Sequence, residues 1–109
     1  LMQAVIFEVW PNEGQSEDYF SMALALKAEL ETVEGFISVE RFESVTAPGK
    51  FLSLSFWRDE KSIQDWYYRM RHKDAQDQGR EDVFKDYRIR VASVIRDYDM
   101  AVGRPPVSI

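Results

Sequence analysis

The feature that most constrains the fold is the stretch from residue 55 to residue 79, where a strand pattern runs directly into a helix pattern. Residues 51–57 alternate between apolar residues and serines, with an aromatic at each end, which predicts a strand ending at Trp57. Asp59 is suited to cap the next helix, because its carboxylate can accept hydrogen bonds from free N–H groups of the first turn. Four apolar residues then follow at i, i+3, i+4 and i+7, the spacing of one helical face: Ile63, Trp66, Tyr67 and Met70. The remaining elements are expected to cover this face.

His72, the only histidine, does not continue that face. At 100° per residue it lies about 180° from Ile63 on a straight helix. Two alternatives follow. Either His72 points to solvent on a continuous helix, or the helix breaks near Arg71 and a second short helix runs on to Gly79. Only a break would let the imidazole turn toward the space beneath Trp66.

Three further segments predict strands, because they are rich in β-branched and aromatic residues or alternate in polarity: 3–10, 36–45 and 87–98. In the second of these, Arg41 interrupts an apolar alternation. Between the first two, a stripe of apolar residues predicts a helix over residues 17–34. Ser16 is its predicted N-cap, and Gly35 can supply a left-handed residue at its C-terminal end.

The elements follow the order β-α-β-β-α-(α)-β, where the bracketed helix is the one that a break at Arg71 would create. This order is typical of the α+β, ferredoxin-like arrangement, a four-stranded antiparallel sheet with its helices on one face. We therefore expect a single domain over residues 1–109. Its core spans about 3–98, and an irregular tail with one glycine and two prolines follows at 99–109.

Helices on one side leave the other face of the sheet uncovered. We expect this face to carry Phe42, Phe51 and Trp57 among serines and charged residues. Because an uncovered, partly apolar face is typical of an interface, the sequence predicts a homodimer formed through it. Glu8 is the one charge inside the first strand, and it lies either at a solvated rim or against a pocket or dimer interface.

Composition excludes several classes of function. A net charge of −5 disfavours attraction to nucleic acid or to an anionic membrane, so we expect neither as a partner. The chain has no cysteine, one histidine and no glycine-rich phosphate loop, so we expect neither a metal nor a flavin cofactor. No apolar run reaches the ~18 residues of a membrane span, and no signal-peptide pattern opens the chain. We therefore expect a cytoplasmic protein.

Several short motifs, taken by their order and spacing, resemble one known family. They are Glu-Gly-Phe at 34–36, Phe-Trp-Arg-Asp-Glu at 56–60, Trp66, His72 and Asp-Tyr-Arg-Ile-Arg-Val at 86–91. Together they resemble the antibiotic biosynthesis monooxygenase (ABM) domain family over almost the whole chain. The resemblance implies a dimeric α/β barrel in which each protomer has a pocket between sheet and helices. It also implies oxidation of a small aromatic or quinol-type compound with O2, without metal or flavin.

The resemblance also implies roles for particular residues. His72 occupies the position where many family members have a histidine, and histidine is the natural base near neutral pH. We expect it to be the catalytic base if the helix breaks, and a solvent-facing residue if the helix is continuous. Four aromatic residues are expected to bind the substrate ring: Phe7, Tyr19, Trp66 and Tyr67.

Two alternatives to a monooxygenase stay open. One is a non-enzymatic, dimeric ligand-binding or stress-response module of the same fold. The other is a haem-binding or haem-degrading relative, because Trp66 occupies a position where that branch has a tryptophan. The first strand, however, carries Glu8 and lacks the asparagine of that branch. The expected partners are a second copy of the chain, a small aromatic molecule and O2.

Overall fold

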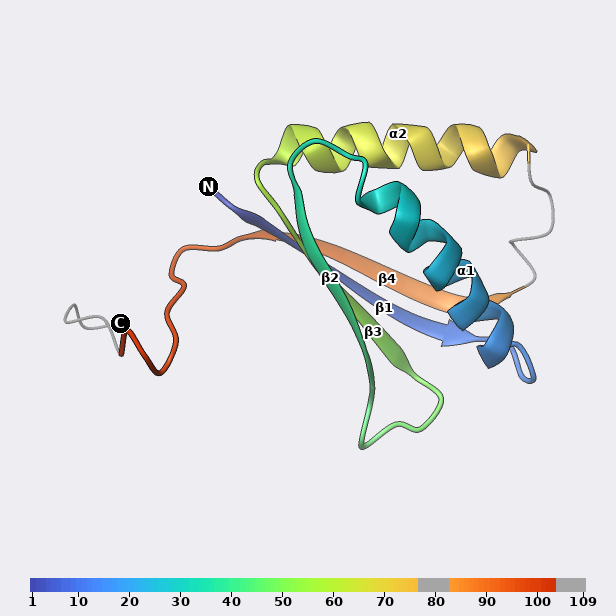
Figure 1. The fold of residues 1–109 in the computed structure, drawn as a ribbon. Coiled ribbons are helices and arrows are strands. Elements are labelled where there is room, and N and C mark those ends of the chain that lie inside the picture. The colour runs from blue at the N-terminus through green and yellow to red at the C-terminus, as the bar shows by residue number, and fades with distance from the viewer. Residues whose placement is uncertain (77–82, 104–109) are drawn as a thin grey trace.

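The computed structural model describes residues 1–76 and 83–103, without the side chains of 73–76. Within these residues the elements are β1 (Gln3–Pro11), α1 (Ser16–Leu30), β2 (Phe36–Glu43), β3 (Phe51–Trp57), α2 (Glu60–Gln76) and β4 (Phe84–Ser93). The strands form one antiparallel sheet in the order β2-β3-β1-β4, and both helices lie on the same side of it (Figure 1). This architecture confirms the predicted α+β, ferredoxin-like fold.

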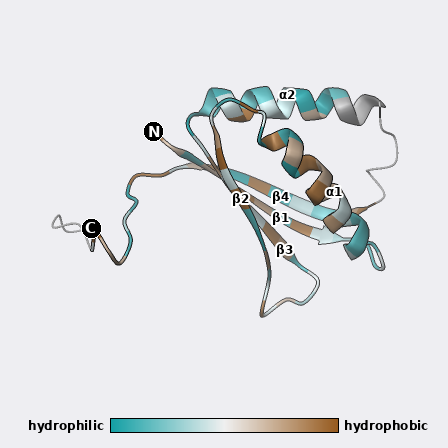
Figure 2. Ribbon diagram, in the orientation of Figure 1, coloured by the Kyte–Doolittle hydropathy of each residue, from teal (hydrophilic) through white to brown (hydrophobic). Residues whose placement is uncertain are grey.

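The core lies between the sheet and the helices, in two clusters. One cluster packs α1 against the C-terminal end of β1 and the N-terminal end of β3. It consists of Val9, Tyr19, Phe51 and Val83. The other lies where α1 ends and α2 begins, and consists of Leu30, Val33 and Trp57 with Ile63 and Trp66 packed against it. Figure 2 shows α2 as mostly hydrophilic, in contrast to α1, so α2 buries only a narrow apolar stripe.

The structure corrects the side of the sheet assigned to two aromatic residues. Phe51 and Trp57 lie beneath the helices, 6% and 2% exposed, so the expectation that they lie on the uncovered face is wrong. They share their side of β3 with Ser53 and Ser55, and Trp57 Nε1 donates a 2.8 Å hydrogen bond to Ser55 Oγ. Because side chains alternate along a strand, the uncovered face instead carries the intervening residues of β3: Leu52, Leu54 and Phe56. Phe42 is paired with Leu52 and lies on that face, as predicted.

Helix α1 differs from the prediction at both ends. It begins at Ser16 with Gln15 as its N-cap, so Ser16 is the first helical residue and not the cap. It ends at Leu30, four residues before the predicted end. The following turns are closed by bonds over three residues, such as Val33 N to Leu30 O (3.0 Å), which tighten the chain too much for an α-helix.

Helix α2 is continuous from Glu60 to Gln76, so of the two alternatives the continuous helix is observed and the break near Arg71 is not. The sequence between these residues contains neither proline nor glycine, the usual causes of a sharp kink. The predicted cap is confirmed, because Asp59 Oδ1 accepts hydrogen bonds from Ser62 N (2.9 Å) and Ser62 Oγ (2.7 Å). Gly79, the predicted end of a second short helix, lies outside the described residues.

Strand β4 ends at Ser93, five residues before its predicted end at 98. Its partner β1 begins at Gln3, and one further bond joins Val94 N to Met2 O at 2.8 Å. Beyond that point β4 has no neighbouring strand with which to pair among the residues that the structure describes. Residues 95–103 therefore leave the sheet and project away from the domain (Figure 1), with a turn closed by a 2.8 Å bond from Gly103 N to Asp99 O. Residues 104–109 lie outside the described residues.

Candidate active site

A large cleft of about 1590 Å³ lies between the covered side of the sheet and the two helices. Every strand and both helices contribute side chains to it, and most of those side chains are apolar. They include Phe7, Tyr19, Met22, Leu26, Ile63, Trp66, Tyr67, Ile89 and Val91. The cleft is open along β4, where Ile89 and Val91 remain 46% and 48% exposed although they point toward the helices. A ligand could therefore enter along this edge and rest on aliphatic and aromatic surface.

The cleft brings together four of the five residues singled out in the sequence. Phe7 and Tyr19 approach it from β1 and α1, and Trp66 and Tyr67 from α2. Tyr19 is held firmly, since its ring stacks on Phe51 with centroids 5.7 Å apart. Tyr67 is 58% exposed and lies at the rim. The four aromatic residues thus combine a closely packed ring, Tyr19, inside the cleft with an exposed ring, Tyr67, at its opening.

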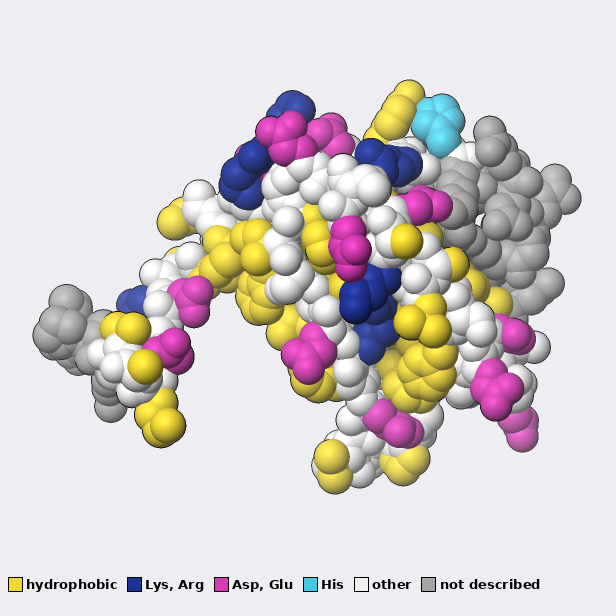
Figure 3. Space-filling view, in the orientation of Figure 1, with side chains coloured by type: hydrophobic (Ala, Val, Ile, Leu, Met, Phe, Trp, Pro, Cys, Tyr) yellow, Lys and Arg dark blue, Asp and Glu magenta, His cyan; other side chains and the backbone are white. Residues whose placement is uncertain are grey.

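His72 is the fifth residue, and it lies outside the lining of this cleft. Its side chain is exposed on the outer surface of α2 (Figure 3, cyan). Its ring packs edge-on against Tyr68, with centroids 4.5 Å apart. The cause is the continuity of α2, which leaves His72 on the side of the helix opposite Ile63.

The cleft also contains two buried polar atoms that were not anticipated. Among the residues that the structure describes, Tyr19 Oη and Arg41 Nε are buried without a hydrogen-bond partner. Burial raises the pKa of Tyr19, and the charge of the neighbouring Arg41 guanidinium and its hydrogen-bonding influence on the phenol partly oppose this rise. Tyr19 is therefore a neutral hydrogen-bond donor near pH 7.

Sequence reasoning assigned Tyr19 to substrate binding but gave Arg41 no role. The sequence does contain a signal for a role of Arg41, because this residue interrupts the apolar side of the second strand. An arginine at an inward position of a strand either forms a buried pair or faces a polar ligand. Arg41 lies opposite Ser53 on the covered side of the sheet, where both line the cleft.

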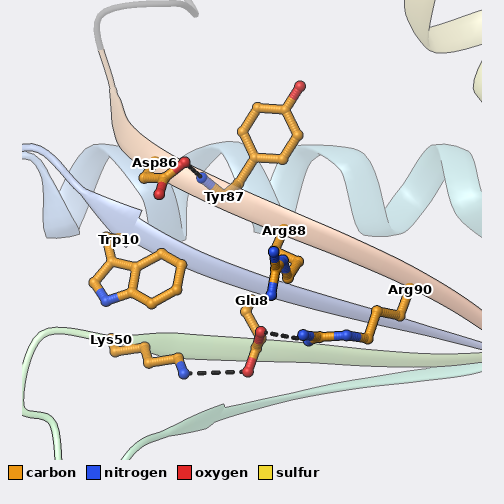
Figure 4. Close-up of a pocket in the computed structure, with 7 residues that line it drawn as sticks. All are labelled: Glu8, Trp10, Lys50, Asp86, Tyr87, Arg88 and Arg90. Atoms are coloured by element: carbon orange, nitrogen blue, oxygen red, sulfur yellow. Dashed lines mark hydrogen bonds and ion pairs between the residues drawn. The ribbon is translucent and has the colours of Figure 1, made fainter.

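A second hollow, of about 530 Å³, lies against β1 and β4 on the uncovered side (Figure 4). At its centre the Glu8 carboxylate lies between Lys50 Nζ (3.1 Å) and Arg90 Nη1 (2.8 Å). These hydrogen bonds, first from Lys50 and then from Arg90, lower the pKa of Glu8. Lys50 Nζ also lies 4.8 Å from the centre of the Trp10 ring. Glu8 is thus a partly exposed, ion-paired carboxylate beside a hollow on the uncovered side of the sheet.

Within residues 1–76 and 83–103, no group of three or more His, Cys, Asp or Glu side chains is arranged to hold a metal ion. In the same part of the chain, no helix is both long and apolar enough to cross a membrane.

Known sequences resemble most of this chain. The family model described as "Antibiotic biosynthesis monooxygenase" matches residues 2–78. A jasmonate monooxygenase ABM of Pyricularia oryzae is 46% identical over 93 residues, which are 85% of this chain and 43% of that protein. The chain thus spans less than half the length of this relative. The uncharacterised protein YqjZ of Bacillus subtilis is 29% identical over 93 residues, 85% of this chain and 79% of YqjZ.

Solved structures share the fold at low identity. Rv0793 of Mycobacterium tuberculosis superposes with a TM-score of 0.75 at 14% identity, covering 91% of this chain and 100% of that one. SnoaB, a cofactor-independent oxygenase of Streptomyces nogalater, superposes with a TM-score of 0.70 at 9% identity, covering 88% of this chain and 95% of SnoaB. With the family match over most of its length, the chain belongs to the antibiotic biosynthesis monooxygenase family.

Proposed function

We propose that this chain is a monooxygenase that binds a small, mostly apolar ring compound in the cleft and transfers to it one atom of O2. The observation that carries the proposal is the cleft itself, which is lined by aromatic and aliphatic side chains from both helices and the sheet. Phe7, Tyr19, Trp66 and Tyr67 are the residues that we assign to contact with the ring. Family membership and the likeness to a jasmonate monooxygenase support the reaction type.

The substrate class that fits without a cofactor is an aromatic or quinol-type compound with an acidic hydroxyl or C–H group. Its anion can pass an electron to O2, so the substrate itself supplies the electrons. One oxygen atom then converts a ring CH2 to C=O, and the other leaves as water together with the two hydrogens. The protein would bind the substrate, orient it toward O2 and exclude water. The role of catalytic base predicted for His72 stays a prediction, which the placement of His72 outside the cleft lining does not favour.

A second substrate class is an organic acid with a non-aromatic ring, because the relative from Pyricularia oryzae is named for jasmonate. Hydroxylation of such a ring consumes O2, two protons and two electrons, and yields the alcohol and water. A substrate of this kind does not supply the electrons, so this reaction would require an added reductant.

The test is oxygen uptake by the purified protein with anthrone, a dihydroxynaphthalene and jasmonic acid, the last with and without NADPH. Under 18O2, we expect one labelled oxygen atom in the product of at least one compound. Heat-denatured protein is the blank. Ligand binding without oxygen uptake would contradict the proposal in favour of a non-enzymatic binding module. A Soret band after mixing with haemin would instead favour the haem-binding alternative.

We also propose that a second copy of the chain covers the outer side of the sheet. That side carries a strip of apolar residues across three strands: Ile6, Phe42, Leu52, Leu54 and Phe56. Because these residues surround no core of their own within the protomer, a matching surface on a second copy would remove them from water.

A further inference from the structure

Two buried polar groups that make no hydrogen bond of ordinary length line the cleft, one from β2 and one from α1. Tyr19 is only 4% exposed, yet its hydroxyl has no hydrogen-bond partner among the described residues. Arg41 Nε is buried in the same way. Both side chains line the cleft. Buried polar groups in folded proteins nearly always have partners, so such a pair requires an explanation.

The positions of both groups are set by the fold. The Tyr19 ring stacks on Phe51 and touches the edge of Phe84, at centroid distances of 5.7 and 6.2 Å, so its hydroxyl cannot easily swing to another partner. Arg41 is held on β2 opposite Ser53, on the covered side of the sheet. The guanidinium is close enough to influence the ionisation of Tyr19, as its opposing effect on the pKa of that phenol indicates.

The chemistry of the two groups is complementary to one kind of ligand atom. A guanidinium stays charged at all ordinary pH values and presents N–H donors in a planar fork that matches a carboxylate. The buried phenol remains protonated near neutral pH and adds a further donor. The Tyr19 oxygen can itself accept from the guanidinium, which leaves the phenol O–H and the remaining guanidinium N–H groups to donate to a ligand. These donors, together with the fixed positive charge of Arg41, form a site for an oxygen anion.

The other charges of the cleft balance, because Arg71 and Lys85 face the same number of carboxylates, Glu60 and Asp86. The charge of Arg41 is therefore the one left over, in a chain whose net charge is −5. An anionic ligand would be drawn to this part of an otherwise acidic protein.

We infer that Arg41 and the Tyr19 hydroxyl form a carboxylate-binding subsite, so that the substrate is an organic acid whose apolar ring lies along Trp66 and Phe7. This inference rests on the proposed function, because it assumes that the cleft holds the substrate. Jasmonate, for which the Pyricularia oryzae relative is named, is itself the anion of a carboxylic acid.

The test compares an acid with its neutral ester. We would titrate jasmonic acid and methyl jasmonate into the full chain and measure binding by isothermal titration calorimetry. Wild-type protein should bind the acid about ten- to hundredfold more tightly, as expected for a charge-assisted hydrogen-bonded pair in a mostly apolar site. Arg41→Gln should lose this preference by weakening only the binding of the acid. Tyr19→Phe, which keeps the ring, should weaken it by a smaller factor of about three to ten.

Arg69→Gln is the matched control, because Arg69 is exposed, bonds to Thr32 Oγ1 at 3.0 Å and lies outside the cleft lining. It should bind both probes like the wild type. Arg41→Lys serves if the glutamine variant fails to fold, since it keeps the charge and loses the fork, and it should retain only part of the preference. Equal binding of acid and ester by wild type, no binding of either, or a preference that survives both Arg41 variants would overturn the inference.

The two proposals fail in different ways. Arg41-dependent binding of the acid without oxygen uptake for any compound would leave the subsite standing and refute the oxygenase. Oxygen uptake with neutral substrates, combined with equal binding of acid and ester, would leave the oxygenase standing and refute the subsite.

Discussion

Gly35 illustrates how a single missing side chain permits a close approach of two elements. It has φ +92° and accepts a 2.7 Å bond from Arg58 N, which joins the end of the α1 turn to the start of α2. A Cβ at this position would overlap the side chain of Ser62, which is only 2% exposed. Gly35→Ala should therefore destabilise the protein by about 3 kcal/mol or more, through both left-handed strain and the clash. Urea denaturation measures this.

Gly49 provides the control for that substitution. It also has a positive φ, +87°, but a Cβ there would meet nothing within 4 Å. Gly49→Ala should cost only the backbone strain, about 1–2 kcal/mol. An equal loss of unfolding free energy in the two variants would show that the contact with Ser62 does not restrict position 35 to glycine.

Asp59 makes the stability of the protein depend on pH in the acid range. The bonds from Ser62, and after them the bond from Arg58, lower the pKa of Asp59 from 3.8 to about 2. Because the pKa is lower in the folded state, the cap contributes its full stability above pH 3.8 and loses it as the pH falls through about 2. Asp59→Ala should therefore lower Tm at pH 7, and its Tm should approach that of wild type near pH 2.

Asp65→Ala is a useful comparison for the Asp59 variant, because Asp65 forms only an exposed ion pair with Lys61 at 3.3 Å. Its Tm at pH 7 should change little. Thermal melts followed by circular dichroism distinguish the two residues. A pH-independent difference between wild type and Asp59→Ala would show that the carboxylate charge does not stabilise the cap.

Helix α2 presents two functionally different sides. Ile63 and Trp66 face the cleft, and His72 lies on the exposed side. We expect Trp66→Ala to weaken substrate binding about tenfold or more, because it removes a large apolar surface from the cleft. His72→Ala should leave binding and oxygen uptake within about twofold of wild type. Steady-state oxygen uptake measures both variants.

The opposite result for His72 would be informative. A positioned base contributes on the order of 10²–10⁴ in rate. A loss of that size in His72→Ala, with unchanged Tm, would show that the imidazole reaches the substrate during catalysis. It would also show that the end of α2 rearranges to allow this.

At the scale of the whole molecule, the uncovered side of the sheet predicts a homodimer at micromolar concentration. An obligate interface of this kind buries roughly 2,000 Å² or more in total. Leu54→Glu should dissociate it, because Leu54 lies within the apolar strip and opposite Glu40 of β2, so a second carboxylate would be placed beside the first. Sedimentation velocity measures the change.

The control for that variant is Leu24→Glu, which changes a leucine that is 73% exposed on α1, away from the sheet. It should sediment like the wild type. A wild-type protein that sediments as a monomer, or a Leu54→Glu variant that remains a dimer, would contradict the proposed interface.

Local sequence signals were enough to predict the helices and strands, their order and the fold class. β3 was predicted with its observed bounds, the cap at Asp59 is confirmed, and Gly35 has the expected left-handed conformation. These features depend on residues that are close in the chain, through side-chain period and backbone propensity. The bounds of α1 and β4 were less well predicted. Helix α1 ends early because tight turns follow it, and β4 ends where its partner strand β1 begins.

The tertiary structure alone decided which side of β3 is covered, because both of its sides carry large apolar residues and alternation does not say which one meets the helices. It also decided the direction of His72, since neither alternative for α2 could be excluded from periodicity. The juxtaposition of Tyr19 and Arg41 could not be predicted either. They lie on different elements, and only the packing of α1 across the sheet brings the hydroxyl and the guanidinium to the same cleft.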